Sequence, residues 1–259
     1  MTNKPLQGIG VLVTRPRTQA AELIDLIENK GGNVVCFPVI EIVPRDVSAI
    51  DAEAALLQPP DISLFVSRNA VAHGLDYAAG GAKGAVGPAT ATAIEITGQA
   101  VDIQPENGFD SESLLVEPAL QNVSGKTIRI IRGDDGRELL ADTLRERGAK
   151  VEYLSVYDRV LPECKPELLA KVETAWQSGS LHATTVMSVQ TLKNLITLLP
   201  DWCRQRIDDM PLVTPATRVI KEALSCCPEA RFHLASGPQA TDMVDAIIAI
   251  QRTNSGPST

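Results

Sequence analysis

One pattern is written twice in this chain of 259 residues. Residues 8–35 predict a short apolar strand, a polar turn, an amphipathic helix, a glycine and a second strand, and residues 125–152 repeat this order without a gap. The repeat places Gly31 opposite Gly148, where each helix must end in a residue with positive φ, and chance rarely aligns such glycines. The chain is therefore an internal duplication, and we expect its function to lie between two similar lobes.

Two later segments repeat as well, at slightly larger offsets that loop insertions would produce. Residues 61–71 resemble residues 182–192, which places Ser67 opposite Ser188. Residues 86–98 resemble residues 213–225. Because strands alternate with helical patterns, each lobe is predicted to be a small doubly wound parallel sheet with helices on both faces. The segments 38–44 and 155–162 alternate with period two and end in proline, which predicts extended connectors.

Composition excludes several classes of protein. The net charge of −8 and the aromatic content of 3% disfavour binding to nucleic acid or to an acidic membrane surface. The N-terminus has no apolar leader, and the five cysteines show no metal-binding spacing, so we expect a cytoplasmic protein with reduced thiols. A small anion remains compatible with this charge, since a ligand in a cleft responds to the local field.

Candidate ligand-binding turns follow the predicted strands. In open parallel sheets, ligands bind beyond the carboxyl ends of the strands, where the next helix presents free N–H groups. Ser, Thr, Asn and Pro also occur there simply to start helices, so both interpretations are open for any single turn. The turns are Thr14-Arg15-Pro16, Ser67-Arg68-Asn69, Gly87-Pro88-Ala89-Thr90, Arg132-Gly133-Asp134, Met187-Ser188-Val189, Thr214-Pro215-Ala216-Thr217 and Ser236-Gly237-Pro238.

The common catalytic motifs are missing. There is no dinucleotide fingerprint and no phosphate loop, and His73, His182 and His233 are widely separated. An enzyme with this sequence would rely on positioning and electrostatics. Tyr157 lies on the second connector, where its side chain projects either over a cleft or into the packing of the connector, and the sequence leaves both open.

Four segments in order carry a family resemblance: residues 11–44, 65–71, 86–91 and 148–162. Together they resemble uroporphyrinogen-III synthase, over Gly8 to Ile250. The resemblance implies two flavodoxin-like α/β domains and a cofactor-free, metal-free enzyme. Its substrate would be hydroxymethylbilane, which is closed to uroporphyrinogen III with inversion of ring D and loss of water. Because pyrroles stabilise the intermediate cation themselves, the protein would mainly bend the chain and exclude water.

The resemblance also implies the site. Tyr157 would be the catalytic residue, contacting the departing hydroxyl or positioning a pyrrole ring. Thr214, where the family usually has glycine, and Gln190 depart from its pattern. The residues expected to bind substrate are Arg15, Gln19, Ser67, Asn69, Pro88, Ala89, Thr90, Ser188, Ala216 and Thr217.

The resemblance changes the expected domain boundaries, because it implies that the chain crosses twice between lobes. We expect residues 1–37 and 164–252 in one domain, 48–154 in the other, 38–47 and 155–163 as connecting strands, and 253–259 as a disordered tail. A monomer is expected, with transient contact to the preceding deaminase and no nucleic-acid or membrane partner. Two alternatives remain: a non-catalytic two-lobed protein that binds a small anion, and a nucleotide-dependent enzyme, which the missing glycine motifs disfavour.

Overall fold

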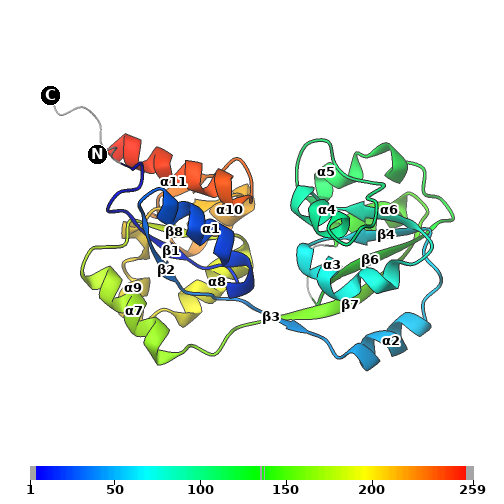
Figure 1. Cartoon of the computed structure of the whole chain (residues 1–259), viewed down its shortest axis with the longest axis horizontal. Helices are drawn as coiled ribbons and strands as arrows, with labels where there is room; N and C mark the ends of the chain where they lie inside the picture. Colours follow the sequence, from blue (N-terminus) through cyan, green and yellow to red (C-terminus); the bar gives the residue numbers. More distant parts are fainter. Residues whose placement is uncertain (1–3, 135, 137, 255–259) are drawn as a thin grey trace. The chain divides into compact units, whose positions relative to one another are not determined.

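The computed structural model describes residues 4–134, 136 and 138–254 of the chain, without the side chains of Cys226 and residues 251–254 (Figure 1). The chain forms two compact units. Unit 1 comprises Met1–Glu41 and Leu161–Thr259, and unit 2 comprises Ile42–Val160. Each unit therefore combines segments from both copies of the repeat.

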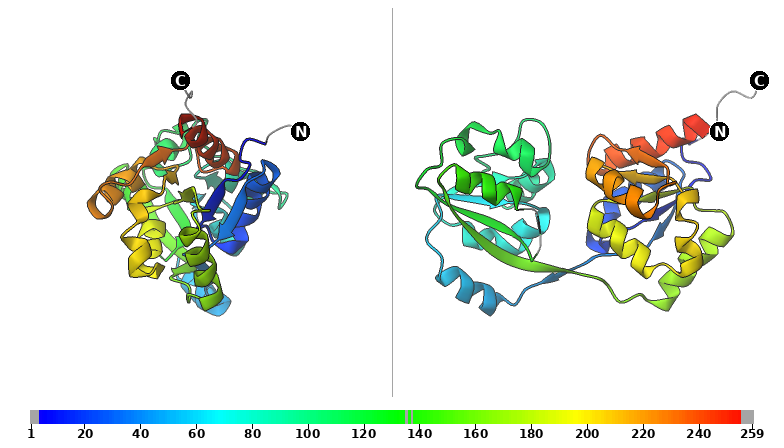
Figure 2. Two further views of the ribbon diagram at one scale, coloured as in Figure 1. Left: turned by 90° about the vertical axis from the view of Figure 1, so that its left-hand side faces the viewer. Right: turned by 180° about the vertical axis from the view of Figure 1, so that it is seen from behind.

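Unit 1 is built on a parallel sheet, in which five strands lie in the order β2-β1-β8-β9-β10. The strands are β1 (Gly10–Val13), β2 (Asn33–Cys36), β8 (Ala183–Thr185), β9 (Leu212–Thr214) and β10 (Phe232–Leu234). Helices cover both faces of the sheet (Figures 1 and 2). They are α1 (Arg17–Asn29), α7 (Pro166–Gln177), α8 (Val189–Leu198), α9 (Asp201–Arg204), η3 (Ile207–Asp209), α10 (Thr217–Cys226) and α11 (Ala240–Asn254).

The buried residues of unit 1 follow the spacing of apolar residues along each strand and helix. The strand β1 is buried along its whole length, as expected for a parallel strand covered on both faces. The helix α1 instead buries one stripe, formed by Ala20, Leu23 and Ile27, and this stripe packs with Met243 and Ile247 of α11. Residues three or four apart share a helix face, so this spacing alone directs α1 onto the sheet.

Unit 2 contains a sheet with the order β3-β7-β6-β4-β5. Its strands are β3 (Glu41–Pro44), β4 (Ile62–Phe65), β5 (Ala82–Ala85), β6 (Thr127–Gly133) and β7 (Lys150–Val160), and β4, β5, β6 and β7 are parallel. Its helical segments are α2 (Val47–Ala55), α3 (Arg68–Gly74), η1 (Leu75–Ala78), α4 (Pro88–Glu95), α5 (Ser111–Leu115), η2 (Pro118–Leu120) and α6 (Leu139–Glu146). One core cluster involves α5 and α6, and another involves α3 and α4.

The two sheets are equivalent under the repeat. In unit 1, β2 and β1 come from the first copy and continue into β8, β9 and β10 from the second. In unit 2, β7 and β6 come from the second copy and continue into β4 and β5 from the first. The order β2-β1-β8-β9-β10 is the 2-1-3-4-5 order of flavodoxin-like folds, so the predicted fold class is confirmed.

The glycine pairs that defined the repeat have matching backbones. Gly31 and Gly148 have φ of 90° and 84°, and Gly8 and Gly125 have φ of 79° and 77°. Positive φ is strongly unfavourable for residues with a Cβ, so glycine ends both helices for the same steric reason.

The segments predicted to connect the two units, residues 38–47 and 155–163, are largely strands of the sheet of unit 2 or lie next to it. Residues 155–160 continue β7 as part of the sheet of unit 2, and β3 lies beside β7 in the same sheet. The segment predicted as a disordered tail begins inside α11, which includes residues 253 and 254, while residues 255–259 lie outside the described residues. The chain thus passes from unit 2 to unit 1 at Val160 and Leu161, directly after a strand.

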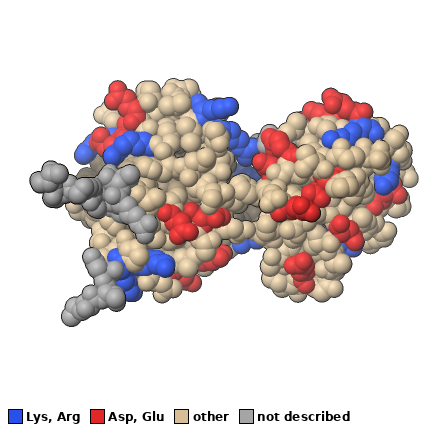
Figure 3. All heavy atoms as spheres, turned by 90° about the horizontal axis from the view of Figure 1, so that it is seen from above, with Lys and Arg blue, Asp and Glu red and all other residues tan. Residues whose placement is uncertain are grey.

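Charge is spread over the surface of both units. On the face that Figure 3 shows, each unit carries both acidic and basic side chains. On this face the charged side chains of both signs are in contact with solvent, as is usual for a protein with a net charge of −8.

Candidate active site

The seven predicted turns all lie at strand ends, although Arg132 and Gly133 are still part of β6 and Thr214 is the last residue of β9. In unit 1, Arg15, Ser188 and Ala216 come after β1, β8 and β9. In unit 2, Ser67 and Pro88 come after β4 and β5. Because the strands within each set are parallel, the turns of one unit share one edge of its sheet. Each sheet reverses its winding direction between two neighbouring strands, β1 and β8 in unit 1 and β4 and β6 in unit 2, which is where open sheets bind ligands.

The paired serines cap helices in the same way. The Ser67 hydroxyl accepts a hydrogen bond from the Ala70 N–H at 3.0 Å, and the Ser188 hydroxyl accepts one from the Thr191 N–H at 3.1 Å. Both serines have extended backbones, the usual N-cap conformation. The alignment of Ser67 with Ser188 therefore reflects one local structure used in both units.

Three other helices at these edges start without a side-chain cap. They are α1, α4 and α10, whose N-caps are Pro16, Gly87 and Ala216. One first-turn N–H of each helix, that of Gln19, Thr90 or Val219, donates to the carbonyl oxygen of the N-cap residue, and no N-cap side chain accepts from the N–H groups before it. These three helix starts are the places where the structure offers backbone donors to an anion.

The turns at Thr90 and Thr217 are less alike than their sequences. Helix α4 begins at Pro88, so Thr90 lies in its first turn and is buried, whereas α10 begins at Thr217, which is exposed. Thr214 explains the difference, because its buried hydroxyl accepts a hydrogen bond from the Ala216 N–H at 3.3 Å. The helix of the second copy begins two positions later than that of the first, where threonine replaces glycine.

Tyr157 has its side chain inside unit 2. The residue is 0% exposed and belongs to the core cluster beneath α3. Its hydroxyl lies 3.0 Å from the Ser67 hydroxyl and accepts a hydrogen bond from Arg159 Nη2 at 2.8 Å. Of the two directions that the sequence left open, the structure shows the packed one, with the hydroxyl reaching the strand-end turn.

A bulge in β7 directs Tyr157 to this place. Arg132 pairs with Ser155, but the next residue, Gly133, pairs with Tyr157, so one residue of β7 is skipped. Val156 and Tyr157 belong to the same core cluster, although neighbours on a regular strand face opposite sides of the sheet. A Cβ at Gly133 would lie 2.6 Å from the tyrosine ring, so this glycine leaves room for it.

Two of the arginines in the turns are held by the protein itself. Arg15 is 7% exposed and donates to the carbonyl oxygen of Pro238 at 2.6 Å. Arg132 donates to a carboxylate oxygen of Glu138 at 3.2 Å and lies over the Tyr153 ring. A hydrogen bond from the Tyr153 hydroxyl, followed by the contact with Arg132, lowers the pKa of Glu138. Arg15 and Arg132 therefore brace these turns, whereas Arg68 and Arg218 are exposed.

The remaining predicted residues lie on first turns. Gln19 of α1, Asn69 of α3 and Ala89 of α4 are half-buried, and Pro88 is exposed at the first position of α4.

Sequence reasoning missed Arg159, whose guanidinium donates to the Tyr157 hydroxyl. The signal was available, because residues two apart on a strand share a face and Arg159 is two positions after Tyr157.

Two searches of the described residues found nothing. No group of three or more His, Cys, Asp and Glu side chains in that part of the chain is arranged to hold a metal ion. Among the described helices, none combines the length and the apolar character that crossing a bilayer requires.

Comparison with known proteins decides the family. The family model described as uroporphyrinogen-III synthase HemD matches residues 21–226, which is more than half of the chain. The chain belongs to the uroporphyrinogen-III synthase family. Among its relatives, the uroporphyrinogen-III synthase of Escherichia coli (strain K12) is 32% identical over 213 residues, covering 76% of this chain and 82% of that protein. That of Salmonella typhimurium (strain LT2) is 31% identical over 207 residues, with the same coverage.

Solved structures share the fold. A mutant uroporphyrinogen III synthase from the extremely thermophilic bacterium Thermus thermophilus has a TM-score of 0.63 at 21% identity, covering 95% of this chain and 99% of the other. The uroporphyrinogen-III synthetase of Helicobacter pylori 26695 has a TM-score of 0.61 at 11% identity, covering 93% and 99%. These structures confirm the predicted α/β fold, and the family that the sequence resembled is confirmed by the family model and the sequence relatives.

Proposed function

We propose that this chain is a uroporphyrinogen-III synthase, a cyclising lyase that converts hydroxymethylbilane to uroporphyrinogen III. The family match over residues 21–226 carries the proposal. That range includes Tyr157, Ser67 and the starts of α4 and α10. Family membership favours this activity over a non-catalytic anion-binding protein.

The hydrogen bonds around Tyr157 favour donation from the Tyr157 hydroxyl to Ser67, and from the Ser67 hydroxyl to the substrate. Arg159 donates to the tyrosine oxygen, so that oxygen already accepts, and its own O–H can donate to Ser67. The Ser67 oxygen also accepts from the Ala70 N–H, which leaves the serine O–H to donate outward. Ser67 is half-buried whereas Tyr157 is 0% exposed. We therefore assign contact with the departing hydroxyl group to Ser67 and a positioning role to Tyr157.

This order fits the chemistry of the substrate. The terminal hydroxyl of hydroxymethylbilane leaves as water by taking up a proton, which breaks a C–O bond and leaves an azafulvenium cation delocalised over a pyrrole; a proton is released again when ring D loses its α-hydrogen on reclosure. The hydroxyl leaves more readily when a donor hydrogen bond stabilises its growing negative charge. Ring D then attacks, and the spiro intermediate fragments and recloses without a cofactor. The protein is required for the donor, for exclusion of water and for the shape of the bound chain.

The carboxylates of the substrate are assigned to the helix starts. The bilane carries eight carboxylates, and the uncapped starts of α1, α4 and α10 present backbone N–H groups at the positive ends of helix dipoles. The other residues expected to bind substrate lie at the starts of helices α1, α3, α4, α8 and α10. They are Gln19, Asn69, Pro88, Ala89, Thr90, Ser188, Ala216 and Thr217. Arg15 supports the turn before α1 through Pro238. The cytoplasmic location, the monomeric state and the contact with the deaminase stay predictions.

The test is the isomer formed. Hydroxymethylbilane is supplied freshly by a deaminase, and the products are separated by chromatography after oxidation to porphyrins. The bilane closes spontaneously to isomer I, so an excess of isomer III that scales with the amount of this protein supports the proposal. Isomer I alone, at the rate without protein, contradicts it.

A further inference from the structure

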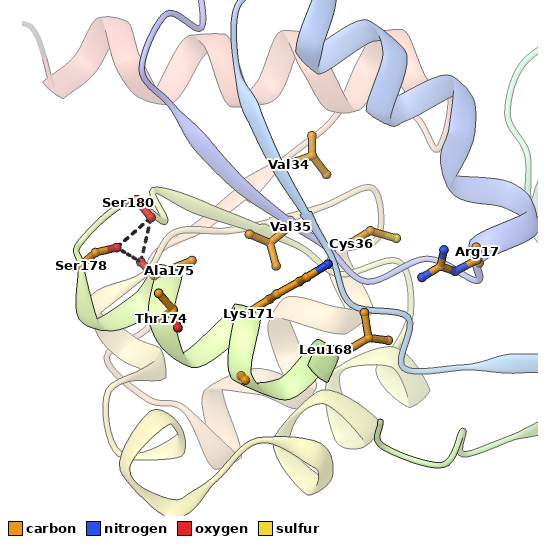
Figure 4. A pocket seen from close by; sticks show the side chains of 11 residues that line it. Arg17, Val34, Val35, Cys36, Leu168, Lys171, Thr174, Ala175, Ser178 and Ser180 are labelled. Carbon is orange, nitrogen blue, oxygen red and sulfur yellow. Dashed lines mark hydrogen bonds between the residues drawn. The ribbon is translucent and has the colours of Figure 1, made fainter. Parts of the chain in front are cut away.

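Unit 1 contains a pocket whose walls, apart from Arg17 at the start of α1, are not part of the proposed substrate site. It has a volume of about 670 Å³ and lies between α7 and β2, the edge strand of the sheet (Figure 4). Val34 and Val35 of β2 and Leu168 of α7 form apolar walls. Pockets of about 300–1,000 Å³ with mostly apolar walls and a few polar groups are typical of small-molecule sites.

Two cationic side chains reach this pocket from different elements. Arg17 is the first residue of α1, and Lys171 extends from α7 toward Cys36 on β2 (Figure 4). In the part of the chain that the structure describes, neither side chain forms a salt bridge or hydrogen bond, and no carboxylate is among the lining side chains. The pocket therefore has unneutralised positive charge beside an apolar surface.

Two serine side chains of the pocket are hydrogen-bonded within it. Ser178 donates to the Ser180 hydroxyl at 3.0 Å, and the Ser180 hydroxyl donates to the carbonyl oxygen of Ala175 at 3.0 Å. Burial raises the pKa of the Cys36 thiol, which keeps it neutral, although the nearby Arg17 opposes this. A neutral thiol does not repel an anion, so Arg17 and Lys171 determine the charge that the pocket favours.

We propose that this pocket binds a small amphipathic anion, with a carboxylate or sulfonate group between Arg17 and Lys171 and an aryl or alkyl body against Val34, Val35 and Leu168. A guanidinium can bind such a group through two parallel hydrogen bonds, and an ammonium adds a point charge. The inference goes beyond the proposed function: Arg17 also belongs to the start of α1, but Lys171, Val34, Val35 and Leu168 are not assigned to the bilane, and Tyr157 and Ser67 belong to unit 2.

The first test is a fluorescence titration of the full chain with 8-anilinonaphthalene-1-sulfonate, an aryl sulfonate of this class. We expect saturable binding of one molecule, weakened at least about tenfold in the double variant Arg17→Gln/Lys171→Gln. The control variant Lys126→Gln/Lys221→Gln removes the same charge at two exposed sites outside the pocket and should bind like the original chain. Absence of saturable binding, or equal affinity in all three proteins, overturns the proposal.

The second test needs no substitution. Cys36 lines the pocket, so the bound sulfonate should slow its alkylation by iodoacetamide, measured by peptide mass spectrometry. Cys164 is half-buried outside the pocket and serves as the internal reference. Protection of Cys36 but not Cys164 supports the site, and equal rates with and without the probe contradict it. Neither readout depends on isomer III formation, so the two proposals fail separately.

Discussion

The hydroxyl of Tyr157 lies 3.0 Å from the hydroxyl of Ser67, which joins the bulged strand β7 to the N-cap of α3. Arg159 donates to the same tyrosine oxygen, and its guanidinium also lies 5.3 Å from the centre of the ring. A buried core side chain thereby connects to the half-buried start of a helix. Substitutions of Tyr157, of Ser67 and of the neighbouring Gly133 should therefore change activity or stability in different ways.

Removing only the tyrosine oxygen tests the positioning role. Tyr157→Phe keeps the buried ring but removes the oxygen that accepts from Arg159 and lies 3.0 Å from the Ser67 hydroxyl. We expect the rate of isomer III formation to fall at least about tenfold, since the donor hydrogen bond loses its support. The free energy of unfolding should fall by about 1–2 kcal/mol, measured by urea unfolding, as for a buried hydrogen bond. An unchanged rate would remove Tyr157 from the mechanism.

Two substitutions of Ser67 separate capping from proton donation. Asparagine caps helices about as well as serine but lacks a hydroxyl, so Ser67→Asn should lose activity at nearly constant stability. Ser67→Ala should lose activity and also about 1 kcal/mol of stability. Ser188→Ala provides the stability comparison, because Ser188 caps α8 in the same geometry. If Ser67→Asn and Ser67→Ala both remain fully active, Ser67 does not donate to the substrate; activity in Ser67→Asn alone would assign the donation to any N–H or O–H at this position.

A methyl group at Gly133 should disturb the tyrosine. The added Cβ would lie 2.6 Å from a ring carbon of Tyr157, which is fully buried and cannot move without repacking. We expect Gly133→Ala to reduce stability by about 1–3 kcal/mol through overpacking and to slow isomer III formation together with it. Stability equal to that of the original chain would show that the ring moves freely, contrary to its packing.

The contacts of Glu138 predict a dependence of stability on pH. Its pKa is lowered from 4.5 in the folded chain, chiefly by the Tyr153 hydroxyl, so the ionised form is favoured by folding. The stabilisation is present above the unfolded pKa and is lost as the pH falls through the lower folded value. Glu138→Gln should therefore be less stable than the original chain near neutral pH and equally stable well below pH 4.5. A difference independent of pH would exclude this carboxylate as its source.

Most of the fold could be predicted from the sequence, because the signals are local. The apolar stripe of α1 and the glycines that end both repeat helices depend on helix periodicity and backbone sterics, which neighbouring residues determine. The same holds for Ser67 and Ser188, since an N-cap is fixed by the strand before it and the helix after it.

The sequence by itself determined the duplication, the parallel α/β sheets, the family and the turns at the strand ends. Only the tertiary structure decided where the side chains of those turns go. Arg15 bonds Pro238, 223 residues later in the chain, and Tyr157 enters the core because a bulge opposite Gly133 turns it inward. These contacts join residues that only strand order and register bring together, and periodicity along one segment contains no information about such distant partners.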